Sequence, residues 1–385
     1  MKTLLKLLII TLTTTTLFCN ANNLKATNNT LNFLNESPKQ KIKVALLLDT
    51  SNSMDGLINQ AKTQLWEIVN ELSYSRCGTE SPDLFIALYE YGNDELEASD
   101  GYIRQVLNFS EDLDEISEKL FALKTNGGSE YCGQVIKTSL KNLEWGTNKN
   151  DLKLIFIAGN EPFTQGSINY KNAAMNANEK DITINTIFCG SYENGISGKW
   201  QDGARLTNGE YITIDHNREI VHIATPYDKI IIELNTKLNG TYINYGNQGY
   251  SKLKLQASQD SEAEELDEVV IVKRAVTKSS RMYKNSSWDL VDAEKDKNFK
   301  YEKLDKKSLP KYLQNKTTEQ VKKYVKIKRN ERIEIQKKIQ DLNKLRNAFI
   351  TKKKQNTSSS NDLESALISA IKKQAMKKNF SWVEN

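Results

Sequence analysis

Residues 44–53, VALLLDTSNS, decide the fold of this chain. The first five are apolar, and small polar side chains follow at once. A continuous apolar run is typical of a strand that is buried on both faces of a parallel sheet. Beyond the polar cluster, apolar residues recur at the spacing of one helix face, at Leu57, Ala61, Leu65 and Val69. The stretch and its continuation therefore predict a strand, a polar loop and a helix in direct succession.

The alternation of strands and helices continues to about residue 240. Apolar segments predict further strands at residues 84–91, 102–109, 152–158, 182–189 and 211–214. Amphipathic segments predict helices at residues 113–123, 132–145, 170–178 and 229–238. This order indicates an α/β fold with a doubly wound, mostly parallel sheet that is flanked by helices. In such a sheet, functional groups lie in the loops at the carboxyl ends of the strands.

The pattern changes after residue 240. Residues 241–316 form an acidic and mixed connecting region, in which the apolar run Val269–Val272 is compatible with a strand. Residues 317–385 form a basic, amphipathic helical tail, with one long helix to residue 354 and a second over 361–378. Charged residues interrupt the apolar stripe of the long helix, so we expect the tail to be coiled-coil-like without a regular heptad repeat.

The N-terminus has the composition of a signal peptide. Two lysines precede an uncharged apolar segment that is too short to span a bilayer, and small residues favour cleavage after Ala21. We therefore expect residues 1–21 to be removed, residues 22–40 to form a flexible linker, and the mature protein to be periplasmic or secreted. Cys19 leaves lipid anchoring as an alternative, which the large phenylalanine before it disfavours.

Charge is distributed unevenly along the 385 residues. The net charge is +5, yet residues 291–385 hold 25 Lys and Arg against 12 Asp and Glu, so the remainder is net negative. A basic tail can bind an anionic surface, dock on the acidic first domain or pair with a partner helix. Nucleic acid is not an expected partner, because aromatic residues are not interleaved with the basic ones.

Three cysteines remain once the N-terminal segment is removed: Cys77, Cys132 and Cys189. Export makes a disulfide chemically permissible. Three cysteines allow at most one bridge, and their spacing does not say which pair would form it. No CxxC pair exists, which argues against a structural zinc site.

The candidate chemistry lies in the polar loop after the first strand. Asp49, Ser51 and Ser53 place one carboxylate and two hydroxyls within five residues. Ligands that are all oxygen suit a hard divalent cation such as Mg²⁺, Ca²⁺ or Mn²⁺. The alternative interpretation is an ordinary helix cap.

This loop resembles the DxSxS motif of von Willebrand factor type A domains, and its position after the first buried strand matches as well. The resemblance covers residues 41–240. It implies a metal-ion-dependent adhesion site at the carboxyl edge of the sheet, where a carboxylate of a partner protein completes the coordination of the cation.

The family predicts a hydroxyl from a second loop, in a Gly-Gly-Thr context before a helix. Here the corresponding stretch is GGSE at residues 127–130, so the resemblance implies that Ser129 provides the hydroxyl. Thr125 is a nearby alternative.

The third ligand of the family is an aspartate after the fourth strand, and this chain departs from the pattern there. Gly159 occupies the expected position. Asn160 can supply a neutral oxygen, and Glu130 or Glu161 can restore the missing charge; we take Asn160 and Glu161 as the candidate ligands. Because the number of charged ligands largely determines cation affinity, we expect a weaker or altered metal site.

No feature of the sequence argues for catalysis. The two histidines, His216 and His222, lie after the last predicted strand, and no nucleophile elbow, phosphate-binding loop or zinc-protease motif is present. We therefore expect a binding module that captures an acidic group of a partner protein through a divalent cation. The alternative is a metal-independent scaffold of the cell envelope that acts through its helical tail.

Overall fold

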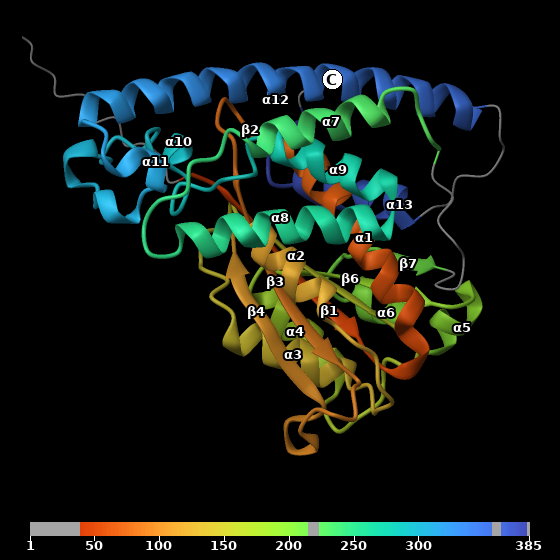
Figure 1. Ribbon diagram of the computed structural model, residues 1–385. Helices are drawn as coiled ribbons and strands as arrows, with labels where there is room; N and C mark the ends of the chain where they lie inside the picture. The colour runs from red at the N-terminus through yellow and green to blue at the C-terminus, as the bar shows by residue number, and fades with distance from the viewer. Residues whose placement is uncertain (1–38, 215–222, 356–362, 383–385) are drawn as a thin grey trace, which may run out of the picture. The chain divides into compact units, whose positions relative to one another are not determined.

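The computed structural model describes residues 39–214, 223–355 and 363–382. Six strands form its central sheet in the order β4-β3-β1-β5-β6-β7 (Figure 1). Their bounds are Lys41–Asp49 for β1, Asp83–Tyr91 for β3, Ile103–Ser110 for β4, Leu152–Gly159 for β5, Thr183–Cys189 for β6 and Tyr211–Ile214 for β7. All pairings are parallel except that of β3 with β4. The predicted doubly wound, mostly parallel sheet is therefore confirmed.

Side chains alternate between two cores on the two faces of the sheet. In β5, Leu154 and Phe156 belong to one core, while Ile155 and Ile157 belong to the other. Helices α1 (Asp55–Ser73) and α2 (Leu113–Phe121) supply apolar residues to the first core. The second core is covered by α3 (Cys132–Asn142), α4 (Tyr170–Glu179) and α6 (Trp200–Arg205), with the short α5 (Tyr192–Ser197) before α6. Both cores explain why the strands read as continuous apolar runs.

The helical region after residue 223 adds to the first face of the sheet. Its elements are α7 (Asp228–Asn239), α8 (Gly249–Leu266), α9 (Glu268–Lys278), α10 (Leu290–Ala293), α11 (Lys311–Gln314), α12 (Thr318–Gln355) and α13 (Leu363–Met376). Helix α12 runs alongside α7, and α9 contacts both α12 and α1 (Figure 1). The described residues from 39 onward form one compact unit.

The apolar run Val269–Val272 is part of helix α9, so the strand that its composition allowed is wrong. Asp267 caps this helix, since its Oδ1 accepts the backbone N–H of Val269 at 2.7 Å. The sequence of this segment resembles that of a buried strand, because the helix is buried on every side by α1, α7, α8 and α12. Periodicity cannot distinguish a fully buried helix from a buried strand.

A buried group of ion pairs joins α9 to its neighbours. Arg274 pairs with Asp114 of α2 at 2.8 Å and with Asp260 of α8 at 2.6 Å. Lys278 pairs with the same Asp260 at 2.7 Å. Burial opposes the ionised form of Asp260, but the two cations outweigh it and hold its pKa well below the ordinary value. Burial lowers the pKa of Lys278 to about 8. These charges satisfy one another in a region that solvent does not reach.

The C-terminal helices are also anchored by buried contacts. Arg332 of α12 pairs with Asp289 at 2.6 Å, and its guanidinium lies 4.0 Å from the ring centroid of Tyr242. Arg346 pairs with Asp228 at 2.8 Å. After α13, strand β8 (Phe380–Trp382) pairs antiparallel with β2 (Ser75–Cys77), which follows α1. Strand β8 is therefore bound to the first part of the fold.

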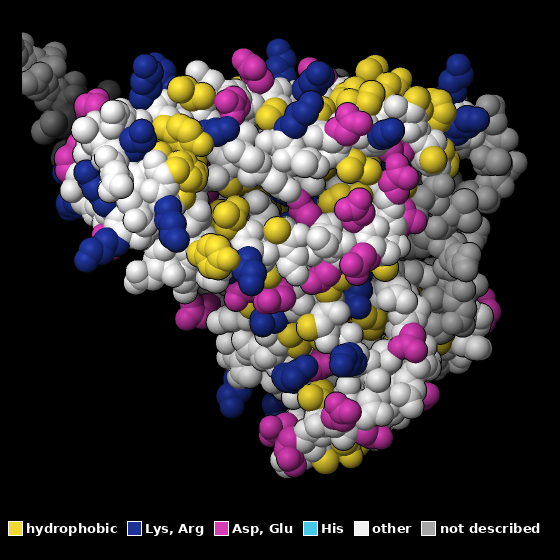
Figure 2. Space-filling model, in the orientation of Figure 1, with side chains coloured by type: hydrophobic (Ala, Val, Ile, Leu, Met, Phe, Trp, Pro, Cys, Tyr) yellow, Lys and Arg dark blue, Asp and Glu magenta, His cyan; other side chains and the backbone are white. Residues whose placement is uncertain are grey.

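Several predictions concern residues outside the described ranges. These are the signal peptide over 1–21, most of the linker, the first two residues of the second tail helix, and His216 and His222. Among the residues that the structure does describe, no helix combines the length and apolar character that crossing a membrane requires. Figure 2 shows Lys and Arg side chains interspersed with Asp and Glu over the visible face.

Candidate functional site

Asp49 ends strand β1 at the carboxyl edge of the sheet and forms the floor of the candidate site. Its side chain is fully buried. One carboxylate oxygen, Oδ1, accepts the backbone N–H of Ser51 at 2.8 Å. This contact turns the chain from the strand into a short 3-10 turn, Asn52–Met54, which leads into α1. The predicted strand–loop–helix succession thus places the first carboxylate beneath the loop.

The hydroxyls of the same loop converge above Asp49. The Oγ atoms of Ser51 and Ser53 lie 3.2 Å apart, and Asn160 donates its amide to the Oγ of Ser53 at 3.0 Å. Ser51 is buried, whereas Ser53 is exposed. The loop after β1 and the loop after β5 are therefore in direct contact, and the site runs from a buried floor to an open rim.

Glu130 supplies a second carboxyl group to the same point. Its side chain is hydrogen-bonded to those of Asp49 and Ser51, and it is almost completely buried. Its Oε2 also accepts the backbone N–H of Glu161 at 3.3 Å. Burial raises the pKa of Asp49 well above its ordinary value, and the adjacent Glu130 raises it further. Burial raises the pKa of Glu130 as well. Two like charges in contact and away from water favour protonation of the pair or a bound cation.

Gly159 lies against Asp49 at the position where the resemblance implies an aspartate. A Cβ atom at this glycine would stand 2.7 Å from the hydroxyl oxygen of Tyr91 and 3.1 Å from Oδ2 of Asp49. Tyr91 is fully buried and donates its hydroxyl to the carbonyl of Ala158 at 2.9 Å. The tyrosine therefore fills the space that a side chain at Gly159 would need, and Glu130 brings its carboxyl group from another loop.

The remaining predicted ligands lie in the same loops but are arranged differently. Ser129 is half-buried, and the structure gives it no hydrogen bond to Asp49, Ser51 or Ser53. The alternative Thr125 donates its hydroxyl to Asp55 at the start of α1. Glu161 has an exposed side chain and contributes backbone contacts, since its carbonyl accepts the indole N–H of Trp200 at 2.8 Å.

The donor set fits a divalent cation. Oδ2 of Asp49 and Oδ1 of Asn160 are buried and lack a hydrogen-bond partner. An unsatisfied buried oxygen of this kind costs roughly 1–3 kcal/mol, which a ligand at the site would offset. The oxygens of two carboxyl groups, two hydroxyls and an amide are the types that Mg²⁺, Ca²⁺ and Mn²⁺ prefer. Within the described residues, no group of three or more His, Cys, Asp or Glu side chains forms a metal cluster.

The cysteines do not form the disulfide that export would permit. Cys77, Cys132 and Cys189 are all free thiols in the described structure. Cys132 belongs to the core on one face of the sheet, while Cys189 belongs to the core on the other, so the sheet separates them. Cys77 lies beside the first core, on strand β2. Burial raises the pKa values of Cys132 and Cys189, which disfavours the nucleophilic thiolate form of both.

Sequence reasoning placed the three loops at one edge of the sheet. It named Glu130 as one of two residues that could restore charge, but chose Glu161 as the ligand. The signal that separates them is burial: Glu130 is 4 % exposed and directly precedes Tyr131 and the buried Cys132 at the start of α3, whereas Glu161 precedes a proline in an open loop.

A mostly parallel α/β sheet with an oxygen-rich loop after its first strand is typical of one class of binding domain. A family model of that class matches part of this chain. Residues 43–197 match the model of the von Willebrand factor type A domain. The chain therefore carries a domain of this type over that range, which is less than half of its length. No curated protein matches the chain by sequence.

The solved structures that match the chain are distant in sequence. A conserved hypothetical protein, BatB, from Bacteroides thetaiotaomicron is 16% identical with a TM-score of 0.35, and the match covers 45% of this chain and 90% of that one. The von Willebrand factor type A domain of SpRpn10 is 14% identical with a TM-score of 0.35, covering 47% and 100%. Proximal thread matrix protein 1 from the mussel byssus, with a zinc-occupied MIDAS motif, is 9% identical with a TM-score of 0.35, covering 47% and 43%.

Proposed function

We propose that this protein is an exported protein-binding module in which a divalent cation at the Asp49 loop captures an acidic group of a partner protein. The observation that carries the proposal is the contact between the buried carboxyl groups of Asp49 and Glu130, beside two serine hydroxyls. A cation would relieve the repulsion between these groups and satisfy the unpaired oxygen of Asp49.

Each residue has a distinct part in this proposal. Asp49 and Glu130 would provide the charge, while Ser51, Ser53 and Asn160 would provide neutral oxygens. Ser129 lies in the same loop as Glu130, and Glu161 follows Asn160 in the loop after β5. These two residues are the candidates for outer ligands. When bound, the cation would supply an electrostatic link between these residues and the carboxylate of the partner. The exposed rim at Ser53 is the side from which a partner can approach.

Calorimetric titration with Mg²⁺, Ca²⁺ and Mn²⁺ tests the metal site. The protein is first freed of divalent cations on a chelating resin. We expect saturable binding of at least one cation, its loss in Asp49→Asn and a weaker affinity in Glu130→Gln. Glu95→Gln removes an exposed carboxylate from a neighbouring loop and serves as the matched control. Absence of heat for all three cations, or equal affinity of Glu130→Gln and Glu95→Gln, contradicts the proposal.

Binding without catalysis is part of the same proposal. The buried thiols have raised pKa values, and the carboxyl pair is enclosed beneath its own loop. Groups in these states are poor nucleophiles.

Export is also proposed, on the composition of residues 1–21. Intact-mass measurement of protein from the cell envelope tests it, and we expect a chain that begins after Ala21.

A second candidate function is a metal-independent scaffold of the envelope. It is favoured by exposed apolar side chains on α12, namely Ile327, Ile333 and Leu345. Because other residues of α12 are buried, substitution of exposed residues is a better test than deletion of the tail. If Ile333→Ser with Leu345→Ser abolishes partner capture from envelope extract while Asp49→Asn and removal of cations do not, the scaffold is correct.

A further inference from the structure

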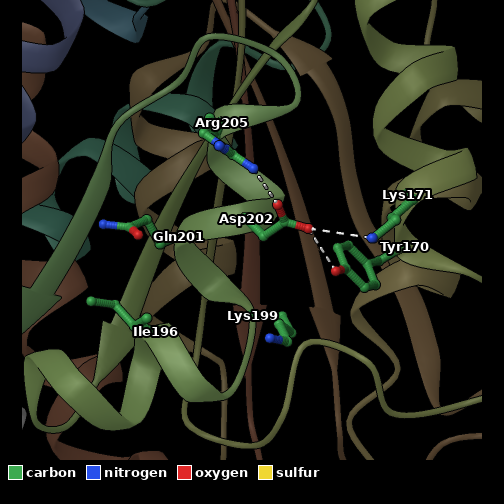
Figure 3. Close-up of a pocket in the computed structure, with 7 residues that line it drawn as sticks. All are labelled: Tyr170, Lys171, Ile196, Lys199, Gln201, Asp202 and Arg205. Atoms are coloured by element: carbon green, nitrogen blue, oxygen red, sulfur yellow. Dashed lines mark hydrogen bonds and ion pairs between the residues drawn. The ribbon is translucent and has the colours of Figure 1, made fainter.

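A pocket of about 350 Å³ lies between α4 and α6, on the face of the sheet opposite α1 (Figure 3). Both helices begin after strands that end at the carboxyl edge, because α4 follows β5 and α6 follows β6. The pocket is lined by residues that include three cations and one carboxylate: Lys171, Lys199, Arg205 and Asp202. Its net charge is therefore positive, in contrast to the acidic loops around Asp49.

Asp202 organises the pocket but does not neutralise it. Its carboxylate accepts the hydroxyl of Tyr170 at 2.8 Å and a guanidinium N–H of Arg205 at 3.1 Å, and lies 3.9 Å from the ammonium of Lys171 (Figure 3). The hydrogen bond from Tyr170 is the main reason that the pKa of Asp202 is lowered, so the carboxylate is ionised. One negative charge thus orients two cations and leaves a positive excess.

Lys199 is the cation that Asp202 does not engage. Its side chain is exposed, and among the described residues no hydrogen bond or ion pair engages its ammonium. Its backbone has a φ of 71°, a left-handed conformation that lysine rarely adopts. The neighbours enforce this conformation, since Trp200 is fully buried and the carbonyl of Gly198 accepts the backbone N–H of Phe163 at 2.8 Å.

We propose that this pocket is a second subsite for the acidic partner, in which Lys199 and Arg205 bind a carboxylate of an acidic peptide segment. A guanidinium and an ammonium around a small cavity are suited to a carboxylate. Trp200 connects the two subsites, because it follows Lys199 and donates its indole N–H to the carbonyl of Glu161. The inference rests on the proposed function for the identity of the ligand, but the pocket needs no cation.

Titration of cation-free protein with a capped tetraglutamate peptide tests the pocket separately from the metal site. We expect saturable binding that weakens as ionic strength rises. Binding should shift the backbone amide resonances of residues 196–205. In Lys199→Gln the affinity should fall about threefold to fivefold, the range for one partly exposed charge pair. Lys254→Gln, an exposed lysine on α8, is the matched control and should bind as the unmodified protein does.

Lys199→Gly keeps the test valid if other variants fold poorly. Glycine adopts the left-handed conformation without strain, so this variant should unfold at a higher temperature and still bind the peptide more weakly. Three outcomes overturn the proposal: no saturable peptide binding, equal affinity of Lys199→Gln and Lys254→Gln, or inorganic phosphate binding as tightly as the peptide. If cations fail to bind but the peptide result holds, the pocket is supported and only the metal site fails.

Discussion

At the scale of single residues, the candidate site lacks a carboxylate at Gly159 and has one from Glu130 instead. The resemblance places an aspartate where the chain has glycine, and the structure explains the glycine by the buried hydroxyl of Tyr91 beside it. Charge reaches the site from Glu130, which lies in a different loop. The aspartate that the resemblance implies at position 159 is thus absent, the hydroxyl of Tyr91 occupies its space, and Glu130 provides a carboxyl group in its place.

Introducing an aspartate at position 159 should therefore destabilise the folded protein. Gly159→Ala places a Cβ against Tyr91 and Asp49, which we expect to lower the free energy of unfolding by about 1–3 kcal/mol. Gly159→Asp adds a third carboxyl group beside a buried pair and should be less stable still at neutral pH. Thermal unfolding of both variants measures the effect. Gly159→Asp with unchanged stability and tighter cation binding would show that the space is available.

At the scale of helices and strands, buried charge joins α9 to α2 and α8. Arg274 and Lys278 meet Asp114 and Asp260 where water is excluded. Such a cluster adds little stability relative to an apolar core, but removal of one member leaves an uncompensated charge. The position of α9 therefore depends on all four residues.

Asp260 should make the stability of the protein sensitive to acid. Its pKa is lowered in the folded state, so its contribution is present above the ordinary value of 3.8 and is lost as pH falls toward the folded value. Asp260→Asn should lower the free energy of unfolding by about 3–5 kcal/mol at pH 7. Urea unfolding between pH 7 and 2.5 measures the difference between the two proteins. It should be constant above about pH 5 and shrink below pH 4; a difference that grows in acid contradicts the assignment.

Strand β8 gives a second prediction at this scale. Phe380 is 3 % exposed and lies in the same core as residues of β1 and α1. Phe380→Ala should lower the free energy of unfolding by about 3–5 kcal/mol, because it leaves a cavity in that core. Met376→Ala, at an exposed position in the preceding helix, should have little effect. Equal effects of the two substitutions in denaturant unfolding would mean that β8 is not docked in solution.

At the scale of the whole molecule, the helical region shares its core with the sheet. One apolar cluster contains Ile42 of β1, Val272 of α9, Ile339 of α12 and Phe380 of β8. Basic residues near the end of the chain also pair with acids of the first part, as Lys372 does with Glu71 at 2.5 Å. Part of the basic charge of the tail is therefore balanced within the chain.

Shared packing predicts a single cooperative unfolding transition for residues 39–385. Differential scanning calorimetry should give one peak, and far- and near-ultraviolet circular dichroism should change together. Asp260→Asn and Phe380→Ala should each move the whole transition. Separate transitions for the sheet and the helices would contradict a common core.

The sequence alone predicted the six strands of the central sheet and the helices α1, α2, α3, α4 and α7 in their correct order, but it did not predict β2, α5 or α6. It also placed the three loops of the candidate site at one edge of the sheet. Local patterns suffice for this, because strand and helix periodicity and the loop after β1 are recorded in neighbouring residues. The long α12 and the second tail helix were predicted for the same reason.

Contacts between residues that are distant in the sequence could be assigned only from the folded structure. It showed that Val269–Val272 belong to a helix, that Glu130 rather than Glu161 lies beside Asp49, and that Cys132 and Cys189 lie on opposite faces of the sheet. Each outcome depends on residues that are far apart in the chain and meet only after folding. Burial from several sides overrides a local pattern, and contact between loops depends on the packing of the helices beneath them.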